Sequence, residues 1–395
     1  MKQSWYLLVC SALLISNSLA GSIQPTQEWI TILVHGIFGF GANFCPRTIF
    51  LAKYDELEGS TYYNQVSLMR EHTYLSTIQP TGKLGLHPVQ KPTDLPDAAY
   101  AFSVLYTDMS NRYLGPEKNT FYTFGWSGLI SEKRRRSEAR QFYRELKQLI
   151  KDRSQQGTIP KIRLIGYSHG ATMFLNFANL RATEFCEDTF LIDETYLLGT
   201  PINNLVGKRL AQEPFKKVYN IYSKSDKVQP LDIFTGGNPF SQWALLGCTP
   251  RNLTQIELRI TAPFHALDGK TYPTSMRGVR DQSPGHVELW SFGWTRTLYR
   301  KTVRWYPMAG GVFIPYLVHA ARSLESNHVK VDIRLLEEQA LVSEYCGLQT
   351  TDVPFMTEKQ FTDFVYKALC FHPNNTAYLE KFLKLQESVP FDAYK

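Results

Sequence analysis

The chain has 395 residues, 43% of them hydrophobic, which is ample for one large α/β domain or for such a domain with a cap. Its formal net charge of +7 falls to +6 without residues 1–20, because Lys2 is the one charged residue of that segment. A chain this mildly basic lacks the charge signature of a nucleic-acid-binding protein, and it contains no internal repeat or low-complexity tract.

Residues 1–20 predict a secretory signal peptide, with an uncleaved anchor as the alternative. Lys2 makes the start positive, residues 5–15 are apolar, and Ser18-Leu19-Ala20 offers small residues before a cleavage point. We therefore expect a protein exported to the periplasm or the cell exterior. An oxidising compartment permits disulfides, but the number of remaining cysteines is odd, so at least one thiol should stay free or pair between chains. These cysteines are Cys45, Cys186, Cys248, Cys346 and Cys370.

The first part of the mature chain predicts one buried strand and a long insertion. Residues 29–34 are a continuous apolar run, typical of a buried parallel strand, and His35-Gly36-Ile37 follows it. Residues 41–120 are long, aromatic and proline-bearing. Because long loops at this end of a parallel sheet often cover a site, we interpret residues 41–120 as a lid or cap.

A strand and a long helix should follow. Residues 121–126 predict a strand, which we expect to pair beside the strand at residues 161–165. Residues 131–154 predict a helix with a one-sided apolar stripe, and its basic run at 133–136 is interpreted as a solvated first turn. Alternating strands and helices predict an α/β fold with a mostly parallel sheet.

The most informative segment is the one that follows residues 161–165. It reads Gly166-Tyr167-Ser168-His169-Gly170 and continues into the apolar, helix-like residues 171–177, so it has the G-x-S-x-G pattern between a strand and a helix. A sharp turn of this kind strains the serine backbone, and glycine on both sides removes the Cβ atoms that would collide with the strand and helix. Ser168 is therefore the predicted nucleophile.

Two further roles are predicted downstream in the order acid, then base. The β-rich residues 217–222 end in a polar turn that presents Asp226, the predicted acid, with Asp232 as the fallback. Two histidines follow the candidate strand at residues 256–260. His286 is favoured as the base because it ends a polar loop and begins an apolar run, and His265 is the alternative base.

If the serine attacks a carbonyl group, the reaction also needs N–H donors for the negatively charged oxygen, the oxyanion, that forms. The main-chain N–H groups of Ile37, after the first strand, and of His169, after the nucleophile, are the predicted donors. Phe38 replaces Ile37 if the register is shifted by one residue. The sequence shows no glycine-rich phosphate loop and no Cys or His spacing typical of a metal site, so we expect neither cofactor nor metal.

Four blocks of this chain resemble lipase-type members of the α/β-hydrolase superfamily. The resemblance covers about residues 29–300 and implies a doubly wound, mostly parallel sheet with serine-dependent ester hydrolysis and no cofactor. Many such enzymes continue Gly-Thr-Pro with His-Gly, whereas this chain has Ile202-Asn203-Asn204, so the subfamily and the substrate stay open. The four blocks are residues 33–39, 166–170, 198–201 and 223–228.

These observations predict a domain plan and a function. Residues 21–300 should form the catalytic domain and residues 301–395 a helical extension packed on it. Basic and aromatic residues at 294–305 would suit either an anionic lipid surface or an ordinary amphipathic helix on the sheet. We expect a secreted serine hydrolase of carboxylic esters, with lipid acyl esters as the favoured substrate. The alternatives are an acyltransferase or thioesterase with the same triad, and a non-catalytic hydrolase-fold binding protein.

Overall fold

The computed structural model describes most of the chain between residues 28 and 371. The predictions for the signal peptide and for Cys45, Asp232, Cys248 and His265 lie outside the described residues. The described residues are 28–38, 51, 56–93, 95–202, 208–229, 242–245, 250–263, 279–281, 283–292, 308–347 and 349–371.

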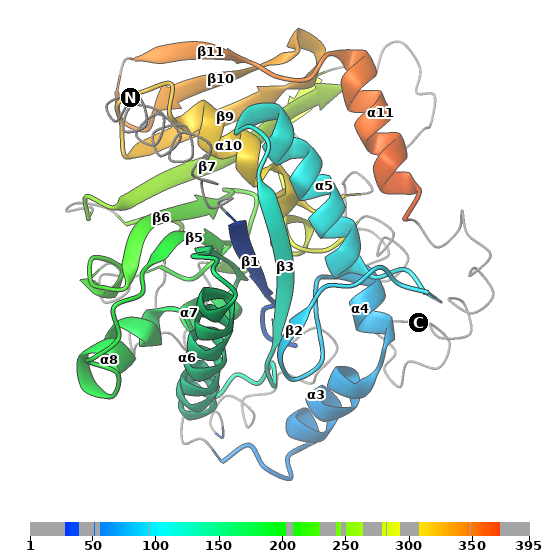
Figure 1. The fold of residues 1–395 in the computed structure, drawn as a ribbon. Coiled ribbons are helices and arrows are strands. Elements are labelled where there is room, and N and C mark those ends of the chain that lie inside the picture. The colour runs from blue at the N-terminus through cyan, green and yellow to red at the C-terminus, as the bar shows by residue number, and fades with distance from the viewer. Residues whose placement is uncertain are drawn as a thin grey trace, which may run out of the picture.

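The described residues form an eleven-stranded mixed sheet, largely parallel, that runs through the molecule (Figure 1). Ten strands follow the order β11-β10-β9-β7-β6-β5-β4-β1-β3-β2, and β8 pairs with β7. Pairing is parallel from β3 to β9, whereas β2, β8, β10 and β11 pair antiparallel with their neighbours. The strands are β1 (Glu28–Val34), β2 (Gly85–Pro88), β3 (Lys118–Gly125), β4 (Lys161–Tyr167), β5 (Ile192–Leu198), β6 (Phe215–Tyr222), β7 (Leu253–Pro263), β8 (Val279–Asp281), β9 (His328–Arg334), β10 (Gln339–Glu344) and β11 (Thr350–Pro354).

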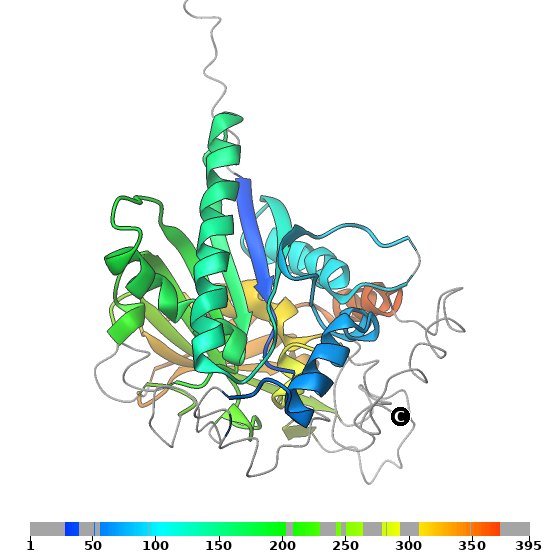
Figure 2. The ribbon, with the colours of Figure 1, turned by 90° about the horizontal axis from the view of Figure 1, so that it is seen from below.

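Helices cover both faces of the central strands. Apolar side chains alternate along each strand, so Ile32 of β1 joins the cluster that includes α6, α7 and α8, and Leu33 joins the cluster that includes α5 and α10. Figure 2 shows α6 and α5 on opposite sides of β1. The helices are α3 (Thr61–Glu71), α4 (Tyr74–Ile78), α5 (Ala98–Tyr113), α6 (Glu132–Gln155), α7 (His169–Thr172), α8 (Leu175–Thr183), α10 (Ile314–Ala321) and α11 (Glu358–Leu369), with short 3-10 turns η4 (Val287–Leu289), η6 (Gly310–Phe313) and η7 (Leu335–Glu337).

The long helix α6 confirms the prediction made for residues 131–154. Ser131 caps its first turn by accepting a hydrogen bond from the Arg134 N–H. The predicted stripe is buried against the sheet, with Ala139, Phe142 and Leu146 fully covered.

The position predicted for residues 121–126 is wrong. These residues belong mainly to β3, which pairs with β1, and β1 rather than β3 lies beside β4. Leu33 of β1 lies between Thr123 of β3 and Ile165 of β4. The exposed and half-buried start of β3 fits a place farther from the centre, whereas β1 is buried along its whole length.

The helical extension predicted for residues 301–395 is also wrong in part, because this segment contributes β9, β10 and β11 to the sheet. The sequence of β9 alternates Val329, Val331 and Ile333, all buried, with polar residues. That period of two is the signal for a strand with one apolar face. Within its described residues, 308–347 and 349–371, the extension therefore combines helices α10 and α11 with three strands.

Part of the segment interpreted as a lid or cap belongs to the core. Strand β2 pairs with β3, and α5 packs beside α10, with Phe102, Leu105 and Tyr106 fully buried. A covering role within residues 41–120 is therefore left, among the described residues, to α3 and α4.

A buried ion network joins β4 to its neighbouring strands, ahead of the G-x-S-x-G turn at the end of β4. Arg163 is fully buried, and its Nε donates to Oε2 of Glu194 on β5 at 2.8 Å. Its Nη atoms reach Glu117 at 3.3 Å, and the guanidinium stacks 3.9 Å from the ring centre of Trp29. This cation therefore compensates two carboxylates inside the fold.

Replacing Arg163 should strongly destabilise the protein. The variant Arg163→Met removes the nearest cation of the buried Glu194 and leaves it only Arg322, at 4.0 Å, so we expect the free energy of unfolding to fall by about 3 kcal/mol in urea titration. The control is Arg140→Met, which removes an exposed pair with Glu184 and should leave the urea midpoint nearly unchanged. Equal midpoints for Arg163→Met and wild type would contradict a stabilising role for the network.

Candidate active site

Ser168 occupies a strained turn between β4 and α7. Its backbone has φ 51° and ψ −133°, a positive φ that residues with a Cβ atom rarely adopt, and such strain amounts to roughly 1–3 kcal/mol. The turn is held by two main-chain bonds. The Ser168 N–H donates to the Leu198 carbonyl at 2.8 Å, and the Ala171 N–H donates to the Ser168 carbonyl at 3.1 Å. The strand-turn-helix context predicted for this serine is therefore present.

The two glycines of the motif are required by close packing. A Cβ atom on Gly166 would lie 2.6 Å from the Ala171 Cα and from the Phe174 ring. A Cβ atom on Gly170 would collide with the carbonyl oxygen of His35, at the end of β1. Neither backbone atom can move without shifting the strand or the helix, so only glycine fits at these positions.

The structure brings Ser168, His286 and Asp226 together. The His286 Nε2 lies 3.0 Å from the Ser168 Oγ, and the His286 Nδ1 lies 2.7 Å from the Asp226 Oδ2. All three side chains are buried, with Asp226 fully covered. Because an ionised carboxylate only accepts, Nδ1 carries the proton and Nε2 can accept from the serine hydroxyl. His265, the alternative base, lies outside the described residues.

Main-chain donors fix the carboxylate of Asp226. Its Oδ1 accepts from the N–H groups of Val228 at 2.9 Å and Gln229 at 3.0 Å, while Oδ2 faces His286. The Gln229 side chain donates to the Thr200 carbonyl at 2.6 Å, and the Trp243 indole donates to the Asp226 carbonyl at 2.9 Å. Sequence reasoning missed Gln229 and Trp243, since nothing local marks a residue that reaches another loop.

Tyr167 holds the backbone of His286, the predicted base. Its hydroxyl donates to the His286 carbonyl at 3.0 Å, and its ring stacks parallel to that of Trp290 with centroids 5.6 Å apart. Tyr167 precedes the nucleophile, so one residue of the motif also positions the histidine that follows β7 and β8 in the chain.

Gly199, in the block Leu-Gly-Thr-Pro, leaves room for the acid and base. It has φ 54°, and a Cβ atom there would lie 3.0 Å from the Asp226 Oδ2 and 3.3 Å from the His286 Nδ1. The resemblance pointed to this block without assigning a role to Gly199. Its place beside the Asp226–His286 hydrogen bond supplies one.

The loop after β1 lies against the nucleophile. A Cβ atom on Gly36 would lie 3.0 Å from the Ser168 Cβ. The Phe38 N–H donates to the Gly128 carbonyl at 2.9 Å, so the alternative donor is already used. The N–H groups of Ile37 and His169 stay the predicted oxyanion donors.

His35 supports that loop as a neutral side chain. Burial lowers the pKa of His35 well below its ordinary value, and the positive charge of Arg70 adds to the effect. Its Nδ1 donates to the Gly36 carbonyl at 2.7 Å, while Nε2 accepts from the Trp126 N–H at 3.4 Å. Since the N–H and C=O of one peptide point in opposite directions, holding the Gly36 carbonyl orients the Ile37 N–H.

Arg135 is a neighbour of the candidate site that sequence reasoning placed wrongly. It belongs to the basic run interpreted as solvated, yet it is buried, and its Nη1 donates to the His169 Nδ1 at 2.5 Å. Its Nη2 donates to Glu132 at 2.9 Å. The buried cation of Arg135 is therefore linked to the nucleophile turn through the side chain of His169.

Across the described ranges, no group of three or more His, Cys, Asp or Glu side chains is arranged to hold a metal ion. No helix in that part of the chain combines the length and apolar character needed to cross a membrane. Cys186, Cys346 and Cys370 are exposed free thiols.

No protein-family model matches this chain, and no curated protein matches it. Among solved structures it is similar to an uncharacterized protein from Pseudomonas aeruginosa, with 11% sequence identity and a TM-score of 0.25. The similarity covers 94% of this chain and 54% of the other, so this chain spans about half the length of that protein. A score this low identifies neither a shared fold nor a shared function.

Strain at Ser168 can be measured without any substrate. Glycine tolerates φ 51°, whereas alanine keeps the Cβ atom, so Ser168→Gly should unfold with a free energy about 1 kcal/mol higher than Ser168→Ala. The control is Ser154 on α6, where the helix reverses the order and Ser154→Gly should be less stable than Ser154→Ala by about 1 kcal/mol. The same order at both positions would argue against strain at Ser168.

Proposed function

We propose that this protein is a serine hydrolase that cleaves carboxylic esters through an acyl-enzyme. The observation that carries the proposal is the hydrogen-bonded series from Ser168 through His286 to Asp226, with distances of 3.0 and 2.7 Å. A nucleophile, a base and a group that orients the base are the three parts that such chemistry requires.

The reaction follows from these positions. His286 Nε2 takes the proton of Ser168 as Oγ attacks the ester carbonyl, and Asp226 stabilises the imidazolium. The N–H groups of Ile37 and His169 receive the oxyanion of the tetrahedral intermediate. His286 then returns the proton to the leaving alcohol, and the acyl group stays on Ser168. In the second half, His286 takes a proton from water as the water attacks the acyl-enzyme, and it returns that proton to the Ser168 Oγ as the acid is released. No step uses a cofactor or a metal.

The strand arrangement supports assignment to the α/β-hydrolase fold. Ser168 follows β4, Asp226 follows β6, and His286 follows β7 and β8, so the acid and the base both come from strands on one side of the nucleophile strand, with β5 between β4 and β6. The strand β1, whose loop carries Ile37, lies on the other side of β4. This order matches the resemblance to lipase-type hydrolases.

Lipid acyl esters are the favoured substrate. Apolar side chains flank the predicted oxyanion loop, where Phe38 packs in one cluster with Leu57 of the segment before α3 and with Leu129 and Ile130 before α6. Ile37 is half-buried and packs against the same cluster. An apolar surrounding of this kind suits the hydrocarbon chain of an acyl group. Export through the N-terminal segment is part of the same proposal.

Loss of a triad member should abolish ester hydrolysis. On a p-nitrophenyl ester series of increasing acyl length, Ser168→Ala, His286→Ala and Asp226→Asn should each lower kcat by on the order of 10³-fold or more. His87→Ala, on exposed strand β2, and His265→Ala should retain the wild-type rate. An added acceptor alcohol, followed by product analysis, separates hydrolysis from acyl transfer. Wild type that is inert on every ester and is not labelled by a fluorophosphonate would favour the non-catalytic alternative.

Adding a methyl group at Gly199 should damage catalysis through the Asp226–His286 hydrogen bond. We expect Gly199→Ala to lower kcat at least tenfold with little change in KM, because the new Cβ atom displaces both partners. Gly157→Ala is a matched control, since Gly157 also has a positive φ, 78°, but no atom lies within 4 Å of the added Cβ. The positive φ alone should lower the free energy of unfolding of both variants by about 1 kcal/mol, and the contacts at Gly199 should add to that loss in Gly199→Ala. An equal loss of kcat in the two would contradict the contact-based explanation.

A further inference from the structure

Arg135 of α6 is a cation on the buried face of its helix. It precedes Ala139 by four residues and Phe142 by seven, so it extends the apolar stripe of α6 by one turn toward the start of the helix. Its side chain is 1% exposed, whereas Lys133 and Arg136 of the same basic run are exposed. Because an apolar side chain could fill this place without burying a charge, the role of the cation must be sought in its contacts.

The contacts of Arg135 lead to the nucleophile turn. Its Nη1 donates to the Nδ1 of His169 at 2.5 Å, and its Nη2 donates to Glu132 at 2.9 Å. Glu132 is partly exposed and also pairs with Arg136 at 3.1 Å. The Nε of Arg135 has no hydrogen-bond partner among the described residues. In this part of the chain, His169 is therefore the buried side chain that the guanidinium bonds.

The bond with Arg135 fixes the protonation of the His169 ring. A guanidinium has only donors, so the His169 Nδ1 must offer a lone pair to it. The ring is then neutral and carries its proton on Nε2. A flipped ring would place a C–H group against the guanidinium and lose the bond. The side chain of His169 is therefore held in one orientation and one tautomer.

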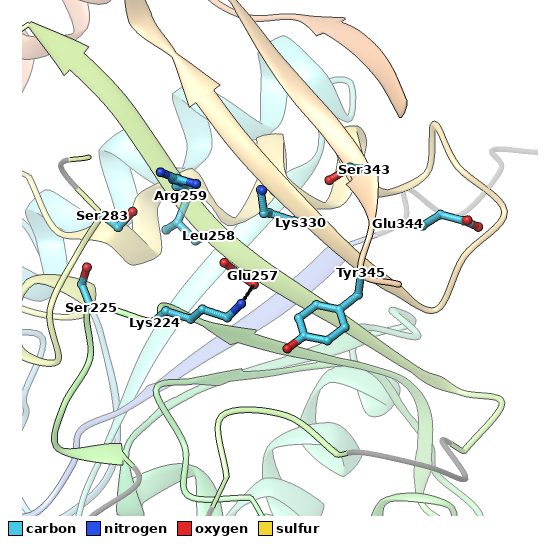
Figure 3. Close-up of a pocket in the computed structure, with 10 residues that line it drawn as sticks. All are labelled: Lys224, Ser225, Glu257, Leu258, Arg259, Ser283, Lys330, Ser343, Glu344 and Tyr345. Carbon is cyan, nitrogen blue, oxygen red and sulfur yellow. Dashed lines mark ion pairs between the residues drawn. The ribbon is translucent and has the colours of Figure 1, made fainter. Parts of the chain in front are cut away.

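Lys224, in the loop after β6, is a cation of a different kind. It lines a polar pocket of about 430 Å³ on β7, β9 and β10, and Figure 3 shows it paired with Glu257, with 3.2 Å between the Nζ and the carboxylate. Its side chain is half-exposed, and no triad residue lines the pocket. Arg135 has a carboxylate partner of this kind in Glu132 and, in addition, its buried bond to a neutral ring. Because the additional bond neutralises no charge, we interpret it as one that orients His169.

His169 begins α7, a helix that depends on contacts from outside. The helix has four residues, and Ser168, at its N-cap, makes no side-chain cap hydrogen bond. A helix this short gains little stability from its own main-chain bonds. Gly170 lies against the carbonyl of His35, and the His169 side chain is held by Arg135 of α6. Both contacts lie within one residue of the His169 N–H, a predicted oxyanion donor.

We propose that Arg135 is a positioning residue, which acts through the His169 ring to keep the His169 N–H directed at the oxyanion. This inference rests on the proposed ester hydrolysis and adds a residue to the same site. Arg135 contacts no reacting atom, so its effect on the reaction passes through His169. Oxyanion donors act at defined positions, so a small displacement of one slows the chemical step more than it weakens ester binding.

Kinetics of the full chain on the p-nitrophenyl ester series test this role. We expect Arg135→Met to lower kcat about tenfold or more, with KM within about twofold of wild type. It should weaken inhibition by an alkyl trifluoromethyl ketone, whose serine adduct carries the oxyanion, by a factor similar to the loss in kcat. Arg136→Met is the matched control and should keep the wild-type kcat, because it removes the other cation that pairs with Glu132.

A double-mutant cycle separates this role from a general effect on the fold. His169→Ala removes the same bond but keeps the main-chain N–H, so it should lower kcat by a factor similar to that of Arg135→Met. Adding Arg135→Met to His169→Ala should then lower kcat by no more than about twofold further. If circular dichroism reveals that Arg135→Met does not fold, His169→Ala decides alone, and a wild-type kcat in that variant would overturn the role.

Nitrogen NMR of the His169 ring reports the bond without any substrate. In the wild type near pH 7 we expect an unprotonated Nδ1 and a protonated Nε2, with signals that move in Arg135→Met and stay in place in Arg136→Met. A proton on Nδ1 in the wild type, or an active wild type whose kcat is unchanged by Arg135→Met, would overturn the positioning role alone. Losses that multiply in the double variant would do the same. A wild type that cleaves no ester would overturn the proposed function, and the positioning role with it, even where the spectrum shows the bond.

Discussion

The close approach of β1 to the turn at Ser168 is the constraint on which the rest of the candidate site depends. The carbonyl of His35 occupies the space that a Cβ atom on Gly170 would need, and Gly36 lies against the Ser168 side chain. Glycine at these positions lets the end of β1 and the nucleophile turn meet at main-chain distance. The same contact brings the loop that carries Ile37, a predicted oxyanion donor, against the nucleophile turn, and it is held by apolar clusters on both faces of the sheet.

Burial then makes the polar contacts of the site specific. A carboxylate inside a protein is tolerated only when its oxygens are bonded, and Asp226 accepts from Val228, Gln229 and His286. Those bonds leave one orientation for the carboxylate and therefore for the imidazole. For the proposed ester hydrolysis, a site held in this way needs no rearrangement, which is the condition under which fixed dipoles accelerate a reaction most.

The two halves of the sheet differ in how their faces are used. The central strands bury apolar side chains on both faces, whereas β7, β9 and β10 bury one face under α10 and carry charged side chains on the other. In the described residues, β7, β9 and β10 therefore extend the sheet with helices packed on one face alone. Their polar face continues into the loops of Asp226 and His286, so the two halves meet where the chemistry is proposed.

Local pattern determined much of this protein in advance. The buried run of β1, the stripe of α6 and the G-x-S-x-G turn are all legible in short windows, because each depends on residues adjacent in the chain. The turns at Asp226 and His286 were also legible locally, but Asp232 and His265 stayed open as alternatives until the structure placed Asp226 and His286 beside Ser168. The alternation in β9 was equally local and could have predicted its strand. Only the tertiary structure decided that β1 separates β3 from β4, that Arg135 is buried against His169, and that Gly199 leaves room for the Asp226–His286 bond. These are contacts between segments far apart in sequence, and residue type alone does not say which distant partner a side chain will meet.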